Sequence, residues 1–178
     1  MKLLSTVSKF LCSRKRLDQA QEQLLIVLNS LDAIVYVADM DSYEILFVNT
    51  YTENIFGDVT GKKCWQSLQA NQTGPCPFCT NDKLVDRDGK PTGTYVWQWQ
   101  NTVNNCWYEC RDRAITWFDG RRARLEIATD ITERKQFLDK LAKSEERFRM
   151  VADYAYDCLL YTSPSPRDRT RSRMPSSA

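Results

Sequence analysis

The chain alternates between stretches with a period of two and stretches with a helical period. Five short runs are alternating or continuously apolar, which predicts strands; they lie at residues 33–39, 44–49, 94–101, 106–118 and 121–129. Three short helices are predicted between the second and third strands, at 52–56, 62–68 and 78–85. This order predicts an α+β domain: a five-stranded antiparallel sheet with short helices on one side.

Helical patterns flank this predicted domain. Leu17, Leu24 and Leu31 are spaced by sevens, which predicts an N-terminal amphipathic helix within residues 1–30. Apolar positions Leu138 and Leu141 continue the pattern after the last strand. Two heptads leave two alternatives open, a coiled-coil seam between two copies or a helix that packs on its own domain.

The composition excludes several kinds of chemistry. The 178 residues contain no histidine, which excludes a Ser-His-Asp triad, a Cys-His pair and His-ligated haem within this sequence. No apolar run approaches the roughly 18 residues of a membrane span, so a membrane location is not indicated. We expect a cytoplasmic, reducing setting, in which cysteines remain thiols or bind metal.

The tail over residues 158–178 differs from the rest of the chain. It reads CLLYTSPSPRDRTRSRMPSSA, without hydrophobic periodicity, and it resembles a translated sequencing-library adaptor. A natural disordered tail is the alternative. Without the tail's four Arg and one Asp, 21 basic and 22 acidic residues remain, a net charge of −1, so nucleic acid is not an expected partner. We expect the natural protein to be longer.

Three cysteines form the most informative group of side chains. Cys76 and Cys79 make a C-P-F-C turn, and Cys64 lies on a neighbouring predicted helix. Thiolates at this spacing bind zinc or an iron–sulfur cluster, or close a redox disulfide. The alternative is that all three are small buried hydrophobic side chains.

The aromatic residues and arginines of the last three strands have structural explanations as well as functional ones. Trp97, Trp99 and Trp107 are candidates for a ligand pocket or a dimer interface, but they fit a sheet core equally well. Arg121, Arg122 and Arg124 are predicted to be solvated strand residues.

The stretch Asp130-Ile131-Thr132 joins the last predicted strand to a helix. The side-chain oxygen of Asp130 or Thr132 can accept a hydrogen bond from the first N–H groups of that helix. A strand that runs directly into a helix can pass on a change in the sheet, so these three residues are candidates for signal relay.

The segment 31–135 resembles a PAS domain, a sensor module of bacterial signalling proteins. The resemblance rests on an ordered set of motifs rather than on one: IVYVAD, ILFVN, IFG, GKKCW and DITERK. It implies a PAS fold, a homodimer through the flanking helices and an effector, a histidine kinase or a diguanylate cyclase, further along the natural chain. Residues 136–157 would hold a linker helix and the start of a second PAS domain.

The residues around Cys64 resemble the flavin-reactive loop of light-sensing PAS domains only poorly, because Lys63 stands where that loop has Asn. Flavin is therefore not expected, and the sequence leaves the cofactor unknown.

Two functions fit these observations. One is a sensory module that responds to a small ligand, a metal or redox state and relays the change through the exit helix. The other is a ligand-free PAS scaffold for dimerisation. Enzymatic activity is not expected in this fragment, which has no nucleotide loop and no paired-carboxylate signature.

Overall fold

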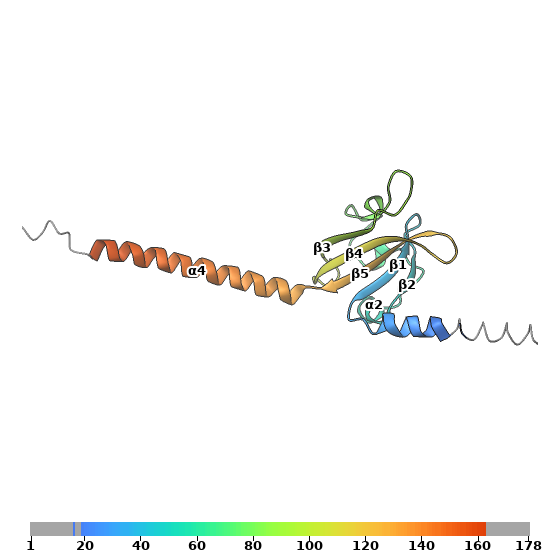
Figure 1. The fold of residues 1–178 in the computed structure, drawn as a ribbon, viewed down its shortest axis with the longest axis horizontal. Helices are drawn as coiled ribbons and strands as arrows, with labels where there is room; N and C mark the ends of the chain where they lie inside the picture. The colour runs from blue at the N-terminus through green and yellow to red at the C-terminus, as the bar shows by residue number, and fades with distance from the viewer. Residues whose placement is uncertain (1–15, 17–18, 163–178) are drawn as a thin grey trace, which may run out of the picture. The chain divides into compact units, whose positions relative to one another are not determined.

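The structure is a computed structural model that describes residue 16 and residues 19–162, with side chains as far as residue 155. Residues 19–29 are helical. The further elements are β1 (Ile34–Asp39), β2 (Ile45–Val48), α2 (Thr50–Phe56), α3 (Cys64–Ser67), η1 (Asn81–Lys83), β3 (Thr94–Gln100), β4 (Trp107–Thr116), β5 (Arg122–Asp130) and α4 (Thr132–Thr162) (Figure 1). Residues 1–15, 17–18 and 163–178 lie outside the described residues; they include Leu17 and most of the tail.

One five-stranded sheet, in the order β2-β1-β5-β4-β3, organises the domain. All four pairs of neighbouring strands are antiparallel, which confirms the predicted α+β class. β1 lies between β2 and β5, and all six of its residues are buried. β1, the first strand of one hairpin, pairs with β5, the last strand of the other, and this pairing joins the hairpins β1–β2 and β4–β5.

Alternation along β4 separates the two faces of the sheet. Tyr108, Cys110, Asp112 and Ala114 are buried, and the residues between them are partly or fully exposed. The buried face belongs to a core that also contains Ile34 and other apolar side chains of β1, β2 and the short helices. This division follows from the geometry of a strand, because successive side chains point to opposite faces.

The helix predicted at 78–85 is wrong; only the 3₁₀ turn η1 forms there. The hydroxyl of Thr80 donates to the Asp112 carboxylate, and the amide of Asn81 donates to the carbonyl of Met40 at 2.9 Å. These contacts hold the segment against β1 and β4. Tertiary contacts of this kind override a local preference for helix.

The chain divides between Thr132 and Glu133 into two compact units. α4 begins at Thr132 and continues to Thr162. Among the described residues, no helix combines the length and the apolar character that crossing a membrane requires.

Candidate functional site

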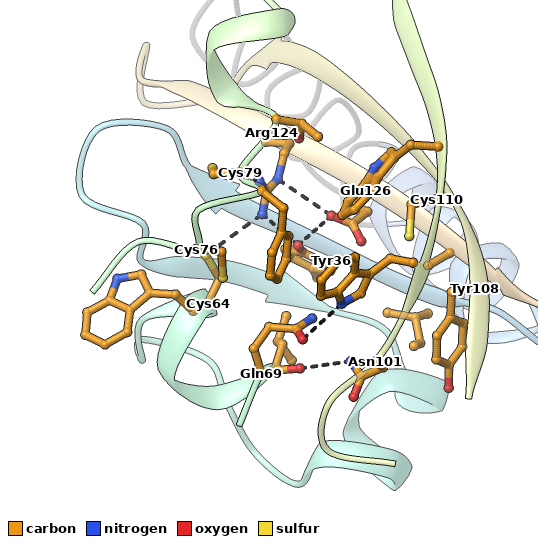
Figure 2. A pocket seen from close by; sticks show the side chains of 18 of the residues that line it. Tyr36, Cys64, Gln69, Cys76, Cys79, Asn101, Tyr108, Cys110, Arg124 and Glu126 are labelled. Atoms are coloured by element: carbon orange, nitrogen blue, oxygen red, sulfur yellow. Dashed lines mark hydrogen bonds and ion pairs between the residues drawn. The ribbon is translucent and has the colours of Figure 1, made fainter. Parts of the chain in front are cut away.

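A cavity of about 60 Å³ lies against the buried face of the sheet. Sheet residues form one wall, and α3 with the 76–80 segment forms another (Figure 2). This volume would hold a few water molecules or a very small ligand. Its polar or thiol-bearing lining residues include Tyr36, Cys64, Gln69, Cys76, Cys79, Asn101, Arg124 and Glu126.

The sheet register places three polar side chains in one row across the strands. Tyr36 of β1 pairs with Glu126 of β5, and Glu126 pairs with Asp112 of β4. All three are nearly or completely buried. Cross-strand partners have Cβ atoms about 5 Å apart, so the register alone makes these side chains neighbours.

Arg124 connects this row to the thiols. Its guanidinium donates to the hydroxyl of Tyr36 at 2.7 Å and to the side-chain oxygen of Asn81 at 3.2 Å. It also lies 3.5 Å from Sγ of Cys79 and 3.9 Å from Sγ of Cys64. Arg124 is only 7% exposed, so the prediction that it is a solvated strand residue is wrong.

Glu126 is the acidic partner of Arg124. The hydroxyl of Tyr36 donates to Oε2 of Glu126 at 2.6 Å, and Nε of Arg124 lies 3.7 Å from the same oxygen. Burial raises the pKa of Glu126 to about 7, and nearby Asp112 adds to the rise, while Arg124 and Tyr36 oppose it. The side chain therefore titrates near neutral pH.

The three candidate cysteines come together at the cavity. Cys64 is buried, Cys76 and Cys79 are partly buried, and all three are free thiols that line the cavity. Cys76 and Cys79 form a turn in which the N–H of Cys79 donates to the carbonyl of Cys76 at 2.9 Å. All three cysteines therefore line the same cavity.

Two of these thiols, those of Cys64 and Cys76, favour the protonated form. Burial raises the pKa of Cys76 to about 11 and also raises that of Cys64, against the opposing effect of Arg124. Metal ligation and rapid disulfide exchange both require a thiolate. Within the part of the chain that the structure describes, no group of three His, Cys, Asp or Glu side chains is arranged to hold a metal ion. Their role stays a prediction.

Two of the three candidate tryptophans line the cavity. Phe78, from the C-P-F-C turn, stacks on Trp99 with ring centroids 3.8 Å apart and lies 6.0 Å from Trp97. The indole N–H of Trp99 donates to the side-chain oxygen of Gln69 at 3.3 Å. Trp107 is not among the lining residues, because it begins β4 on the other face of the sheet.

The candidate relay residues contact the start of β4. The N–H of Ile131 donates to the carbonyl of Trp107 at 2.8 Å, and Oγ1 of Thr132 accepts from the N–H of Trp107 at 2.9 Å. Oδ1 of Asp130 accepts from the N–H of Thr132 at 2.7 Å. Asp130 therefore satisfies the first N–H group of α4, while Thr132 ties the exit segment to the sheet.

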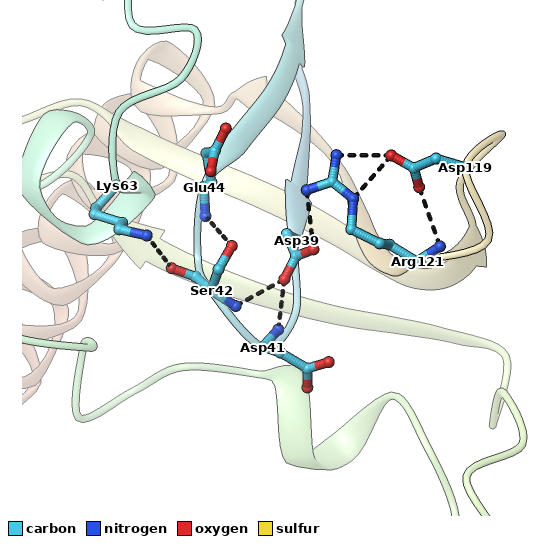
Figure 3. Close-up of polar contacts among 7 residues, drawn as sticks. All are labelled: Asp39, Asp41, Ser42, Glu44, Lys63, Asp119 and Arg121. Atoms are coloured by element: carbon cyan, nitrogen blue, oxygen red, sulfur yellow. Dashed lines mark hydrogen bonds and ion pairs between the residues drawn. The ribbon is translucent and has the colours of Figure 1, made fainter.

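A second polar cluster lies where the two hairpins turn (Figure 3). Oδ1 of Asp39 accepts from the N–H groups of Asp41 and Ser42 at 2.9 and 2.7 Å, and Oδ2 lies 3.4 Å from Arg121. Arg121 also pairs with Asp119 at 2.7 Å. Burial alone would raise the pKa of Asp39, but the backbone donors of Ser42 and Asp41 hold it below its ordinary value. This cluster fastens the turns and does not line the cavity.

Sequence reasoning missed the ionic part of the site. Tyr36, Asp112, Arg124 and Glu126 were not among the predicted site residues. A signal was present, since the alternation in β4 already places Asp112 on the same face as Cys110 and Ala114. An acidic side chain on an otherwise apolar buried face requires a hydrogen-bonding or oppositely charged partner there.

Comparison with known proteins finds structural likeness only. No family model matches the chain, and no curated protein gives a significant match. The PAS domain of an HTR-like protein from Haloarcula marismortui is 16% identical with a TM-score of 0.46, covering 67% of this chain and 98% of that one. The PAS domain of BvgS from Bordetella pertussis is 18% identical with a TM-score of 0.43, covering 73% and 98%.

A sensory box histidine kinase/response regulator from Burkholderia thailandensis is 14% identical with a TM-score of 0.45, and the match covers 72% of this chain and 98% of that one. Further PAS domains match over most of the chain. The TM-scores of these matches lie below 0.5. The antiparallel sheet in the order β2-β1-β5-β4-β3, with its helices, is an α+β fold.

Proposed function

We propose that this chain carries a sensory PAS module that detects a change in its cavity and relays it through the Asp130–Thr132 segment. One observation carries the proposal: the cavity wall and the exit segment share β4. Tyr108 and Cys110 line the cavity, and the backbone of the preceding residue, Trp107, is bonded to both Ile131 and Thr132. A shift of β4 would therefore reach the first turn of α4.

The sequence resemblance to PAS domains supports a place in a signalling protein. The corresponding effector would be a histidine kinase or a diguanylate cyclase in the same natural chain, and the setting would be cytoplasmic. The relay is an allosteric element only if a change in the cavity biases the exit segment between two states.

Filling the cavity tests the proposal. Ala128 is 2% exposed and lines the cavity, so Ala128→Val or Ala128→Leu places extra methyl groups there. We expect a change in hydrogen–deuterium exchange at the amides of Ile131 and Thr132. Ile127→Leu is the matched control, because Ile127 points to the other face of β5. Unchanged exchange in folded Ala128 variants would contradict the relay.

The cysteines are the second part of the sensing hypothesis. Zinc or iron bound by Cys64, Cys76 and Cys79 would give a stoichiometric metal content under anaerobic purification, and iron would add a visible absorbance band. Cys76→Ser should abolish that metal. A metal-free protein in which the thiols of Cys64 and Cys76 react slowly at neutral pH would instead fit the raised pKa of these two residues.

A ligand-free dimerisation scaffold is the second candidate function. Exposed apolar side chains on each flanking helix favour it: Leu24 and Val27 in the helical segment 19–29, and Leu138, Leu141 and Phe148 in α4. Homodimerisation through these helices remains part of both proposals. Sedimentation of Leu138→Glu would show whether α4 joins two copies, and the cavity-filling experiment separates the scaffold from the sensor.

A further inference from the structure

Two carboxyl groups face each other beneath the cavity. Asp112 of β4 and Glu126 of β5 are direct cross-strand partners on the buried face of the sheet. Asp112 is fully buried and Glu126 is 8% exposed. Like charges directly opposite one another destabilise a sheet, and burial strengthens the repulsion.

The hydrogen bonds of Asp112 are incomplete. Its Oδ2 accepts from the hydroxyl of Thr80 and, at 2.9 Å, from the indole N–H of Trp97. Its Oδ1 is buried and has no partner in the structure. A buried acceptor without a donor costs free energy, so a donor is expected at this position. Glu126 is the neighbour across the strand, and it can donate only in its protonated form.

We propose that Asp112 and Glu126 form a proton-binding site, in which one proton on Glu126 bridges to Oδ1 of Asp112. The shared proton removes the repulsion between the two carboxylates and supplies the missing donor in one step. The site needs no ligand in the cavity, so it goes beyond the sensory function proposed above and stands without it.

Five other titratable groups surround Glu126. They are Tyr36 from β1, Cys110 and Asp112 from β4, Arg124 from β5 and Cys64 from α3. Burial raises the pKa of Tyr36, Cys110 and Cys64, which keeps these groups neutral at pH 7. The pKa of Arg124 is also raised, despite burial, because Tyr36 and Glu126 stabilise its charge, so it stays cationic.

Proton loss changes the charge of the cavity wall. With the proton bound, the cation of Arg124 balances one carboxylate. Without it, two carboxylates face one guanidinium, and the Tyr36–Glu126 hydrogen bond is made to a charged acceptor. The pKa of Glu126, about 7, places this change in the physiological range.

Infrared difference spectroscopy of the whole chain tests the site. A protonated carboxyl has a carbonyl stretch well separated from that of a carboxylate. We expect one such band to disappear as the pH rises through about 7 and to be absent in Glu126→Gln. In Asp112→Asn the midpoint should move at least tenfold in proton concentration toward acid, because the like charge is gone. Glu109→Gln, on the outer face of β4, should leave the band unchanged.

The proposal fails if no carboxyl band is lost near neutral pH, or if the band persists in Glu126→Gln. Carbon-13 NMR of glutamate carboxyls in the unsubstituted protein covers the case in which a variant does not fold. One glutamate with a midpoint near 7 supports the site, and ordinary acidic midpoints for every glutamate overturn it.

Discussion

Arg121 and Arg124 lie three residues apart and have opposite surroundings. The side chain of Arg121 is 45% exposed and bridges Asp39 and Asp119 where the two hairpins turn. The side chain of Arg124 is 8% exposed and contacts Tyr36, Asn81, Glu126 and two thiols. Water screens the first cluster but hardly reaches the second. Removing one partner of an ion pair therefore costs little stability in the first cluster and much in the second.

The first cluster has a structural role, whereas the second forms part of the candidate site. The Asp39 cluster satisfies backbone donors at a turn and fastens two hairpins. The Arg124 cluster gathers charges, thiols and hydroxyls around one cavity, where each group perturbs the others. Strongly perturbed ionisable groups beside a cavity are typical of functional sites.

Removing Arg124 should have the largest effect. Arg124→Met leaves Glu126, Tyr36 and Asn81 without their common partner, and breaking a buried pair in this way costs about 3–5 kcal/mol of unfolding free energy. Denaturant unfolding at pH 8 measures it. Arg122→Met, at an exposed neighbouring position, should change stability little. An equal loss in both variants would contradict the role of Arg124.

The pH dependence of stability should be the next largest effect. The folded protein holds the Glu126 proton more tightly than the unfolded chain does. Stability therefore falls as the pH rises from about 4.5, and the loss is complete above the folded pKa of about 7. We expect a loss on the order of 2–3 kcal/mol, measured by urea unfolding between pH 5 and 8. Glu126→Gln should be flat over this range; a slope unchanged in that variant would assign it to another group.

Phe78 should have a smaller effect with a clear optical signature. Phe78→Ala removes the ring that stacks on Trp99, which costs about 1 kcal/mol beyond the loss of buried area. Tryptophan fluorescence should shift to longer wavelength as water enters the cavity wall. Phe118→Ala is the matched control, because Phe118 is 87% exposed and packs only on Trp117 among the described rings. Identical spectra for the two variants would argue against an ordered aromatic wall.

Arg121→Ala should have the smallest effect. Water and salt screen its contacts with Asp39 and Asp119, so the change in unfolding free energy should lie near the limit of measurement and shrink further in high salt. A large, salt-independent loss would place Arg121 among the core contacts instead.

Asp39 and Glu126 affect the pH dependence of stability in opposite directions. Because the pKa of Asp39 is lowered, the stabilisation that it contributes is present above pH 3.8 and is lost as the pH falls.

Most of the fold can be predicted from the sequence, because it depends on local periodicity. The five strands, α2 and α3 follow from alternation and turn residues, and Gly57 ends α2 with φ of +77° as a C-cap glycine does. The helix expected at 78–85 fails because Thr80 and Asn81 bond to distant strands. Those contacts form only once the sheet has assembled, so no pattern in the local sequence predicts them.

The candidate site, too, could be predicted from the sequence only in part. The grouping of Cys64 with Cys76 and Cys79 could be predicted because the turn and the neighbouring helix are close in sequence. Arg124 could not be assigned, because Arg122 and Arg124 look alike in a strand until the register places one beside Tyr36 and Glu126. Strand register, rather than residue type, decides which of the two becomes buried.

A double-mutant cycle between Arg124 and Glu126 measures whether the buried cluster is more strongly coupled than the exposed one. Arg124→Met, Glu126→Gln and the double variant give the coupling free energy of the buried pair, and Arg121→Met with Asp119→Asn gives that of the exposed pair. We expect a coupling of about 1–3 kcal/mol for the buried pair and none that is measurable for the exposed pair. Equal coupling in the two clusters would show that the Arg124 network is an ordinary ion pair rather than the organised wall of a site.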